Sequence, residues 1–358
     1  MRILYTITAI VSLQIGFCQN SPINIDMQDA NWILPKDAIF ENFDNRKTLL
    51  LKGNRATVKN LQFRNGTIEV DVYANSKRSF AGITFRKQND HMEEVYMRMH
   101  KSSQVDAVQY TPIFNNESNW QLYPEYQAQV TFKNKGWNHL RIEVTNTAAE
   151  VFVNNQSVLI IDQLRTEQHI GEIGLFALFS NRFSNFRVTH RDIKVKAKSE
   201  IKDSIISESS VITQWKITKA KPYTVKGLNF EKILNAEYTT VQTETSGLLP
   251  ISKYIKKSSS GNFEQNKEDY IVALKTITAI KDETKLFSFD YSDKIIIYLN
   301  DKKYFTGNNS FRAKGVQYMG HMNFNSNTLH LPFKKGLNTI HCVVIDKANG
   351  WGLMAKLD

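Results

Sequence analysis

Short segments of alternating apolar and polar residues dominate this 358-residue chain. In residues 67–73, for example, Ile68, Val70 and Val72 share one parity, and polar residues or tyrosine take the other. A period of two buries one set of side chains on one face of a β-strand. Turn signals such as Asn65-Gly66 separate the segments. Since no long stretch carries the 3.6-residue apolar period of a helix, we predict an all-β chain.

The strand-like segments fall into two groups. The first group comprises residues 67–73, 81–86, 94–100, 128–132, 139–144, 150–153, 174–179 and 183–189. The second comprises residues 213–218, 269–280, 284–290, 294–299, 328–331, 338–346 and 351–357. Many short strands at regular spacing favour sandwiches or barrels.

The stretch between the two groups, residues 196–212, is rich in Lys, Ser and Glu and contains no pattern that would pair as a strand. We therefore predict two β-sandwich domains of jelly-roll type, at residues 26–195 and 213–358, joined by a short polar linker at 196–212. Within the second domain, the polar segment 248–266 is expected to form a long surface loop.

The first 18 residues are typical of a secretory signal peptide. Arg2 is followed by a mostly apolar run, Ile3 to Ile15, and Gly16-Phe17-Cys18 then offers small residues at the −3 and −1 positions. The run is too short to cross a bilayer, so we expect no membrane span. A lipoprotein anchored through Cys18 is disfavoured because bulky Phe17 stands where a small residue is required. The predicted location is secreted, periplasmic or at the cell surface.

Cysteine and charge exclude several classes of protein. Loss of the signal peptide removes Cys18 and leaves only Cys342, which excludes an intramolecular disulfide. Cys342 lies in a strand-like run, which favours a buried core thiol over a nucleophile. The net charge is +11, but the lysines are scattered, without a basic helix or an arginine-rich arm. This distribution predicts affinity for acidic polymers and no nucleic-acid partner.

The sequence predicts no cofactor. It contains no Cys/His cluster, His-Glu-x-x-His motif or EF-hand spacing, which argues against transition-metal catalysis. A structural Ca²⁺ stays compatible with the chain because loop carboxylates and carbonyls that bind Ca²⁺ need no fixed spacing.

The run from Tyr96 to Tyr123 is the main candidate for a functional site, because planar hydrogen-bonding groups and amphipathic rings are dense within it. Alternation places Arg98 and His100 on one face of a strand, with Met97 and Met99 on the other. The candidate ligand-binding residues of this run are Arg98, His100, Asp106, Gln109, Tyr110, Trp120 and Tyr123.

A hairpin across residues 101–105 would bring Arg98, His100, Asp106 and Tyr110 together. An Arg–Asp pair can grip vicinal hydroxyls in a bidentate way, and His100 beside Asp106 would be oriented as a general base. Trp120 and Tyr123 would stack on a pyranose ring. The alternative is structural: an ion pair, a histidine satisfied within its strand and a tryptophan that plugs the sandwich edge. Both interpretations stay open here.

Six consecutive motifs give the first half a family resemblance. They are residues 63–71 (Phe-Arg-Asn-Gly-Thr-Ile-Glu-Val-Asp), 80–86, 137–144 (which opens with Trp-Asn), 149–154, 171–176 and 183–188. By their order and spacing, residues 37–192 resemble the concanavalin-A-like lectin/glucanase fold. More narrowly, they resemble the branch with 3-keto-disaccharide hydrolase-type domains and laminin-G-like modules. The resemblance implies a β-sandwich associated with sugars.

The acidic motif of glucanases with this fold is incomplete in this chain. Those enzymes carry two catalytic carboxylates and a further acid on one strand. Here Glu69-Val-Asp71 is followed by Tyr73 and Ala74, so the third acid is missing. The departure argues against a retaining glucanase and moves the prediction from catalysis toward binding. Glu69 and Asp71 are then expected to be solvated positions on a half-exposed strand.

Residues 213–358 resemble a galactose-binding-like jelly roll of the kind appended to bacterial carbohydrate-active enzymes. The resemblance is carried by residues 294–301, by Leu331-Pro-Phe-Lys-Lys-Gly-Leu-Asn338 and by Asn349-Gly-Trp-Gly352. Trp351 is therefore a further candidate ligand-binding residue. It would either stack on a sugar or lock the terminal strand.

The leading functional hypothesis is an exported protein that binds a glycan or polysaccharide through the first sandwich, aided by the second. The rival hypothesis is a sugar-active hydrolase or lyase that uses His100 with Asp106 or Arg98. A third is a structural or adhesive surface protein. The sequence predicts neither the sugar nor the oligomeric state.

Overall fold

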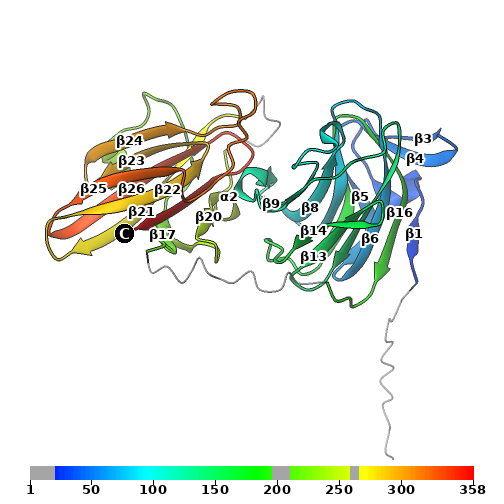
Figure 1. Ribbon diagram of the computed structural model, residues 1–358, viewed down its shortest axis with the longest axis horizontal. Coiled ribbons are helices and arrows are strands. Elements are labelled where there is room, and N and C mark those ends of the chain that lie inside the picture. The colour runs from blue at the N-terminus through cyan, green and yellow to red at the C-terminus, as the bar shows by residue number, and fades with distance from the viewer. Residues whose placement is uncertain (1–20, 196–209, 259–265) are drawn as a thin grey trace, which may run out of the picture.

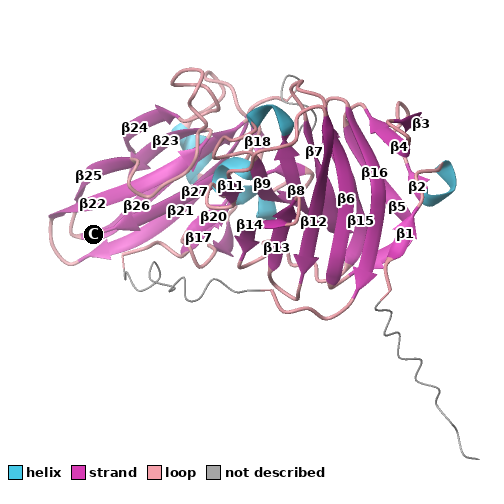
Figure 2. Cartoon of the chain, turned by 45° about the vertical axis from the view of Figure 1, so that its right-hand side comes forward, coloured by secondary structure: helices cyan, strands magenta, loops and turns pink. Residues whose placement is uncertain are grey.

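Two β-rich bodies lie side by side in the computed structural model (Figure 1), which describes residues 21–195, 210–258 and 266–358. The all-β prediction is confirmed: strands dominate both bodies, and the helical turns are few and short (Figure 2). The predicted signal peptide and residues 196–209 of the predicted linker lie outside the described residues. No helix in the described ranges is long and apolar enough to span a membrane.

The first sandwich consists of two antiparallel sheets of eight strands each. The first sheet has the order β14-β13-β12-β6-β16-β4-β3, with β1 paired to β16. Its strands are β1 (Ile23–Ile25), β3 (Ile39–Phe43), β4 (Arg46–Leu51), β6 (Gly66–Ala74), β12 (Gly136–Val144), β13 (Ala149–Val153), β14 (Gln156–Ile161) and β16 (Asn181–His190).

The second sheet has the order β10-β9-β8-β7-β15-β5-β2, with β11 paired to β9. Its strands are β2 (Trp32–Ile33), β5 (Asn54–Phe63), β7 (Phe80–Gln88), β8 (His91–Arg98), β9 (Val108–Phe114), β10 (Glu117–Ser118), β11 (Gln127–Ala128) and β15 (Gly171–Leu178). Three 3₁₀ turns accompany the sheets, η1 (Asp29–Asn31), η2 (Met99–Lys101) and η3 (Trp120–Leu122).

Alternation along the strands builds the core of the first sandwich. In β6, Ile68, Val70 and Val72 are fully buried between the sheets, whereas Glu69 and Asp71 lie half-buried on the outer face. Each buried aliphatic side chain of this kind contributes about 1.5–3 kcal/mol relative to an exposed one. The inward and outward faces predicted for this strand are therefore confirmed.

The second sandwich pairs a seven-stranded sheet with a four-stranded one. The larger sheet contains β17 (Gln214–Ile217), β18 (Lys221–Pro222), β19 (Thr239–Gln242), β21 (Asp269–Ala279), β23 (Lys294–Leu299), β24 (Lys302–Asn308) and β26 (Gly336–Asp346). The smaller sheet has the order β20-β27-β22-β25, with β20 (Leu248–Pro250), β22 (Glu283–Ser292), β25 (Asn327–Phe333) and β27 (Gly352–Leu357). Two short helices are α1 (Phe230–Leu234) and α2 (Ile251–Tyr254).

The expectation of a surface loop at residues 248–266 is wrong for the first part of that segment. Leu248 and Leu249 belong to β20, which pairs with β27, and Ile251 begins α2; all three side chains are buried. The apolar segment Leu-Leu-Pro-Ile was too short to show the alternation of a strand. It is buried because β20 pairs with the terminal strand β27. Residues 259–265 lie outside the described residues.

The two sandwiches are joined through η3 and α2. Gln121 in η3 donates from Nε2 to the Met319 carbonyl at 2.6 Å, and Asn115 Nδ2 donates to the carbonyl of Ser252 in α2 at 2.8 Å. Leu122 packs against Gly350 and Gly352 so closely that a Cβ at either glycine would lie within 3 Å of it. The segment around Trp351 therefore has glycines on both sides because the first sandwich approaches it there.

Candidate functional site

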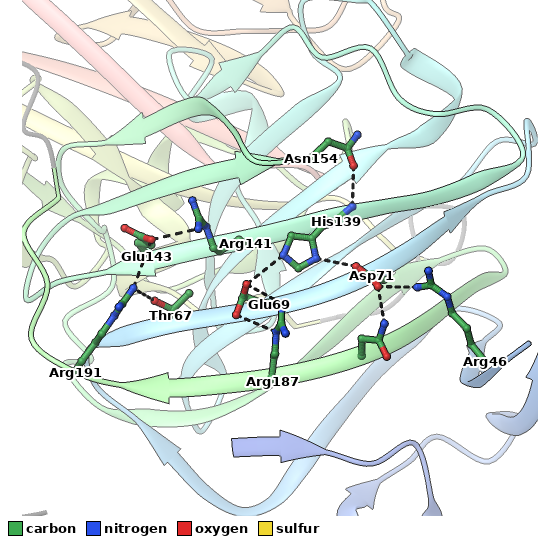
Figure 3. A network of polar contacts seen from close by, with 11 residues as sticks. Arg46, Thr67, Glu69, Asp71, His139, Arg141, Glu143, Asn154, Arg187 and Arg191 are labelled. Atoms are coloured by element: carbon green, nitrogen blue, oxygen red, sulfur yellow. Dashed lines mark hydrogen bonds and ion pairs between the residues drawn. The ribbon is translucent and has the colours of Figure 1, made fainter. Parts of the chain in front are cut away.

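A network of charged side chains covers the outer face of the first sheet (Figure 3). Its centre is formed by Glu69 and Asp71 of β6 and His139 of β12. The antiparallel register places His139 directly opposite Asp71, so their side chains meet on one face. His139 Nδ1 lies 2.7 Å from Asp71 Oδ1, and its Nε2 lies 3.2 Å from Glu69 Oε1. The imidazole is thus held between two carboxylates.

Neighbouring strands add cations and an amide to this centre. Arg46 of β4 donates from Nη1 to Asp71 Oδ2 at 2.7 Å, and Arg187 Nε of β16 lies 3.1 Å from Glu69 Oε2. Asn185 Nδ2 donates to Asp71 Oδ2 at 2.7 Å. The register of β16 against β6 shifts between Ser184 and Arg187, and Asn185 has a φ of +52°. A β-bulge re-aims side chains in this way, and here it turns Asn185 onto the network.

His139, Glu69 and Asp71 are all charged at neutral pH. Hydrogen bonds to Asp71 and Glu69 raise the pKa of His139 to about 9. The His139 hydrogen bond lowers the pKa of Glu69. Burial alone would raise the pKa of Asp71, but hydrogen bonds from His139 and Asn185 outweigh it and lower that pKa. Because both ring nitrogens of His139 carry protons directed at carboxylates, the imidazolium is a fixed cation and not a general base in this state.

An open groove of about 700 Å³ runs beside this network. Its lining comes from β1 and the residues after it, the turn before β4, and β4, β6, β12 and β16. The lining residues are Asn24, Ile25, Asp26, Met27, Asn45, Arg46, Lys47, Asp71, His139, Ser184, Asn185, Phe186 and Arg187. Polar and charged side chains predominate, so the groove fits a hydrophilic ligand. No group of His, Cys, Asp and Glu side chains suited to a metal ion occurs in the ranges that the structure describes.

Two aromatic side chains adjoin the groove through Arg46. The Arg46 guanidinium lies 4.7 Å from the centroid of the Trp137 ring, and Trp137 contacts Tyr73 edge to face at 5.3 Å between centroids. Trp137 also donates from Nε1 to Asp44 Oδ2 at 2.6 Å. Both rings are half-buried on the same outer face as Asp71. Planar hydrogen-bonding groups and partly exposed rings are therefore neighbours here.

Three of the residues predicted from the Tyr96–Tyr123 run meet on the second sheet. Arg98, at 3% exposure, donates to the Asp106 carbonyl at 2.7 Å and to Gln109 Oε1 at 3.2 Å. The Asp106 carboxylate lies 3.9 Å from Arg98 and 3.5 Å from Lys101. The predicted Arg98–Asp106 ion pair is thus present, but Arg98, Asp106 and Gln109 are all buried. Its role in ligand binding stays a prediction.

Two other residues of the run lie elsewhere. Strand β8 ends at Arg98 and η2 follows, so the period of two breaks before His100, whose Nδ1 lies 3.2 Å from the Ser79 carbonyl. The expected orientation of His100 by Asp106 is therefore replaced by a contact with a backbone carbonyl. The expected convergence of Tyr110 with Arg98 is wrong, because the register pairs Tyr110 with Val95. Tyr110 points into the core and donates to Glu93 Oε2 at 2.7 Å.

The aromatic candidates lie at or behind the junction of the two sandwiches. Half-buried Trp120 donates from Nε1 to Asn349 Oδ1 at 3.1 Å, and fully buried Tyr123 donates to Glu244 Oε1 at 2.7 Å. Trp351, at 1% exposure, donates to the Val344 carbonyl at 3.2 Å inside the second core. For Trp351 the structure therefore favours the strand-locking alternative. The ligand-binding assignments of these residues stay predictions.

Sequence reasoning missed the network on the first sheet. Glu69 and Asp71 were expected to be solvated, and His139, Arg46 and Arg187 were not among the candidates. Glu69 and Asp71 are instead half-buried between cations. A signal was available, because alternation after Trp137-Asn puts His139 on the polar face of its strand. The register that pairs His139 with Asp71 could not be predicted, because it depends on strands that are distant in sequence.

Comparisons with known proteins concern the first sandwich. Residues 29–196 match the family model of a 3-keto-alpha-glucoside-1,2-lyase-like domain. No curated protein matches the chain. The match supports the resemblance predicted for residues 37–192, whereas the galactose-binding-like resemblance of residues 213–358 stays a prediction.

Similar solved structures include the carbohydrate-binding module CBM66 from Bacillus subtilis, with 12% identity and a TM-score of 0.36, over 44% of this chain and 96% of that one. A putative glycosyl hydrolase from Parabacteroides distasonis has 15% identity and a TM-score of 0.35, over 49% of this chain and 100% of that one. A β-1,3-1,4-glucanase derived from a mouse hindgut metagenome has 9% identity and a TM-score of 0.35, over 47% and 98%.

Proposed function

We propose that the protein binds a carbohydrate in the groove beside Glu69, Asp71 and His139. The observation that carries the proposal is the fixed array of carboxylates, imidazolium, guanidinium and amide around one open groove. Each sugar hydroxyl both donates and accepts hydrogen bonds, and charged planar groups form strong, directional bonds with it. Because the array is already held by its own hydrogen bonds, little ordering cost is left for ligand binding.

The aromatic neighbours support the same class of ligand. Arg46 lies over the Trp137 ring, and Trp137 and Tyr73 both stay partly exposed; such rings pack against the apolar face of a pyranose. Asp71 accepts three hydrogen bonds, whereas a carboxylate offers about four lone-pair positions. An acceptor position therefore remains for a ligand hydroxyl. The proposal includes export through residues 1–18 and assistance from the second sandwich, which is docked against the first.

Substitution of the network tests the proposal. Wild-type protein, Asp71→Asn and His139→Gln are compared on a glycan array, and the best glycan is then titrated by calorimetry. Glu143→Gln is the matched control, because Glu143 lies on the same face of β12 and does not line the groove. Loss of one charged hydrogen bond should weaken binding at least about tenfold, or about 1.4 kcal/mol. Unchanged affinity in both groove variants would refute the proposal.

A second candidate function is a 1,2-lyase acting on 3-keto-α-glucosides, favoured by the family match of residues 29–196. In such a sugar the C2 proton is acidic because C2 adjoins the ketone. A base removes it, the C1–C2 double bond forms, the C1–O bond breaks and an acid protonates the departing oxygen. His100 has the properties of such a base: burial lowers its pKa, so the ring is neutral. Its Nδ1 donates to the Ser79 carbonyl, which leaves the Nε2 lone pair free.

A direct assay separates the two functions. The full chain is incubated with a methyl 3-keto-α-glucoside, and release of methanol and appearance of the unsaturated ketone are followed. A lyase using His100 should lose activity at least about a hundredfold in His100→Gln, since general-base catalysis contributes about 10²–10⁴-fold. Absence of product with wild-type protein, or turnover that survives this substitution, removes His100 from the reaction.

A further inference from the structure

A strained, exposed phenylalanine stands at the edge of the first sandwich. Phe179 follows β15 in the turn that leads to β16, has a φ of +67° and is 45% exposed. A bulky residue in the left-handed region is a conformational outlier that persists only where the surroundings impose it. Here buried Asn181 imposes it, donating from Nδ2 to the carbonyls of Phe80, Leu178 and Phe179 at 2.9, 3.4 and 3.4 Å. The chain thus holds an aromatic ring where burial does not require one.

Phe179 belongs to a small aromatic surface on the second sheet, here called the Phe179 platform. It consists of Arg78, Phe80, His100 and Phe179. The Phe80 ring lies 6.3 Å from that of Phe179 and 5.0 Å from that of His100, between centroids. None of these residues lines the groove beside Asp71. The platform is therefore separate from the groove, although it includes His100, the base of the second candidate function.

The platform is positively charged. The Arg78 guanidinium lies 5.5 Å from the Phe179 ring and 6.0 Å from the Phe80 ring. Among the described residues, exposed Arg78 has these ring contacts and no carboxylate partner. Burial lowers the pKa of His100, and the cations at Arg78, Lys101 and Arg98 lower it further. An unpaired cation beside two aromatic rings suits a ligand with an apolar ring face and a negative charge.

We propose that the Phe179 platform binds a glycan that carries carboxylate groups, such as a polymer of uronic acid. The pyranose ring packs on Phe179 and Phe80, and its carboxylate pairs with Arg78. Charge complementarity selects this occupant over a neutral glycan, in keeping with a net charge of +11. The inference goes beyond the groove, since it assigns a second surface and a charged class of sugar to it.

The probe is a tetramer of galacturonate, titrated into the full chain by calorimetry, with its methyl ester as the neutral counterpart. Wild-type protein should bind the acid about tenfold more tightly than the ester. Phe179→Gly should lose at least about tenfold in affinity for the acid while its Tm is unchanged or higher, because glycine adopts a positive φ without strain. Phe179→Asn should behave in the same way, since asparagine tolerates a positive φ better than phenylalanine does. Arg78→Gln should bind acid and ester equally.

Ile280→Ala is the matched control: it removes an exposed apolar side chain, 84% accessible, from the second sandwich and should leave binding unchanged. The proposal is overturned if Phe179→Gly binds the acid as wild-type protein does, or if acid and ester bind equally to wild-type protein. A clear fall in the Tm of both Phe179 variants would also overturn it, because Phe179 would then be a packing residue. These outcomes do not depend on Asp71→Asn, so failure at the groove and failure at the platform are distinguishable.

Discussion

Replacement of His139 by glutamine should remove a stabilisation that depends on pH in a defined direction. The two carboxylates raise the pKa of His139 from 6.5 to about 9 in the folded protein. A pKa raised by folding stabilises the protein fully below the unfolded value, and this contribution is lost as the pH rises through the folded value. The stabilisation should therefore be complete below pH 6.5 and disappear between pH 6.5 and about 9.

The size of this effect follows from the same two values. A rise in pKa from 6.5 to about 9 corresponds to at most about 3.4 kcal/mol of stabilisation. Each tenfold change in the acid dissociation constant contributes about 1.36 kcal/mol. The side chain of His139 is 21% exposed, and solvent screens its ion pairs. We therefore expect about 1–2 kcal/mol at pH 6 and a difference near zero at pH 10.

Two measurements check this reasoning. The pKa of His139 is measured directly by NMR titration of its ring protons, and urea unfolding of wild-type and His139→Gln protein is compared from pH 6 to pH 10. Only the difference between the two proteins is used, because two docked sandwiches need not unfold in one step. A ring that titrates near pH 6.5, or a difference in stability that grows with pH, would contradict the assigned network.

Two further predictions concern buried groups. Glu244→Ala should destabilise the protein by about 3–5 kcal/mol, measured by urea unfolding, because it leaves the nearly buried Arg165 guanidinium, 3.2 Å away, without its main carboxylate. Glu125→Ala is the control, since Glu125 is 52% exposed and 3.9 Å from the same cation, and it should cost less than about 1 kcal/mol. Burial raises the pKa of the Cys342 thiol, so this residue should react with a disulfide reagent only as fast as the protein unfolds; rapid labelling of folded protein would place the thiol outside the core.

The sequence predicted the strands well because a period of two is a local property. Segment 294–299 was placed at its observed bounds, and the outward face of β6 followed from alternation alone. Errors arose where the chain leaves a strand for a local reason. Strand β8 ends at Arg98 and η2 begins at Met99, so His100 lies outside the strand. Of the predicted strand at 128–132, only Ala128 at the end of β11 is confirmed.

The candidate site was harder to predict because it depends on register. Composition drew attention to Arg98 and Asp106, which are close in sequence and do meet. The contact of His139 with Asp71 joins residues far apart in the chain, and a one-residue slip would have put His139 into the core. The bulge that turns Asn185 onto Asp71 carries no clear sequence signature in Ser184-Asn185-Phe186. Long-range pairing, and not local composition, creates this site.

The abundance of polar residues in the Tyr96–Tyr123 run has a structural cause in addition to the predicted role in ligand binding. A junction between two sandwiches buries backbone and side-chain polar groups that must be paired, and Trp120, Gln121 and Tyr123 pair with groups of the second sandwich. Leu122 fits against Gly350 and Gly352 at distances that no larger residue would allow. Separation of the sandwiches would expose this leucine and leave buried polar groups without partners. Binding and turnover should therefore be measured on the full chain, since a loss of activity in an isolated first sandwich would report the broken junction and not the absence of a site.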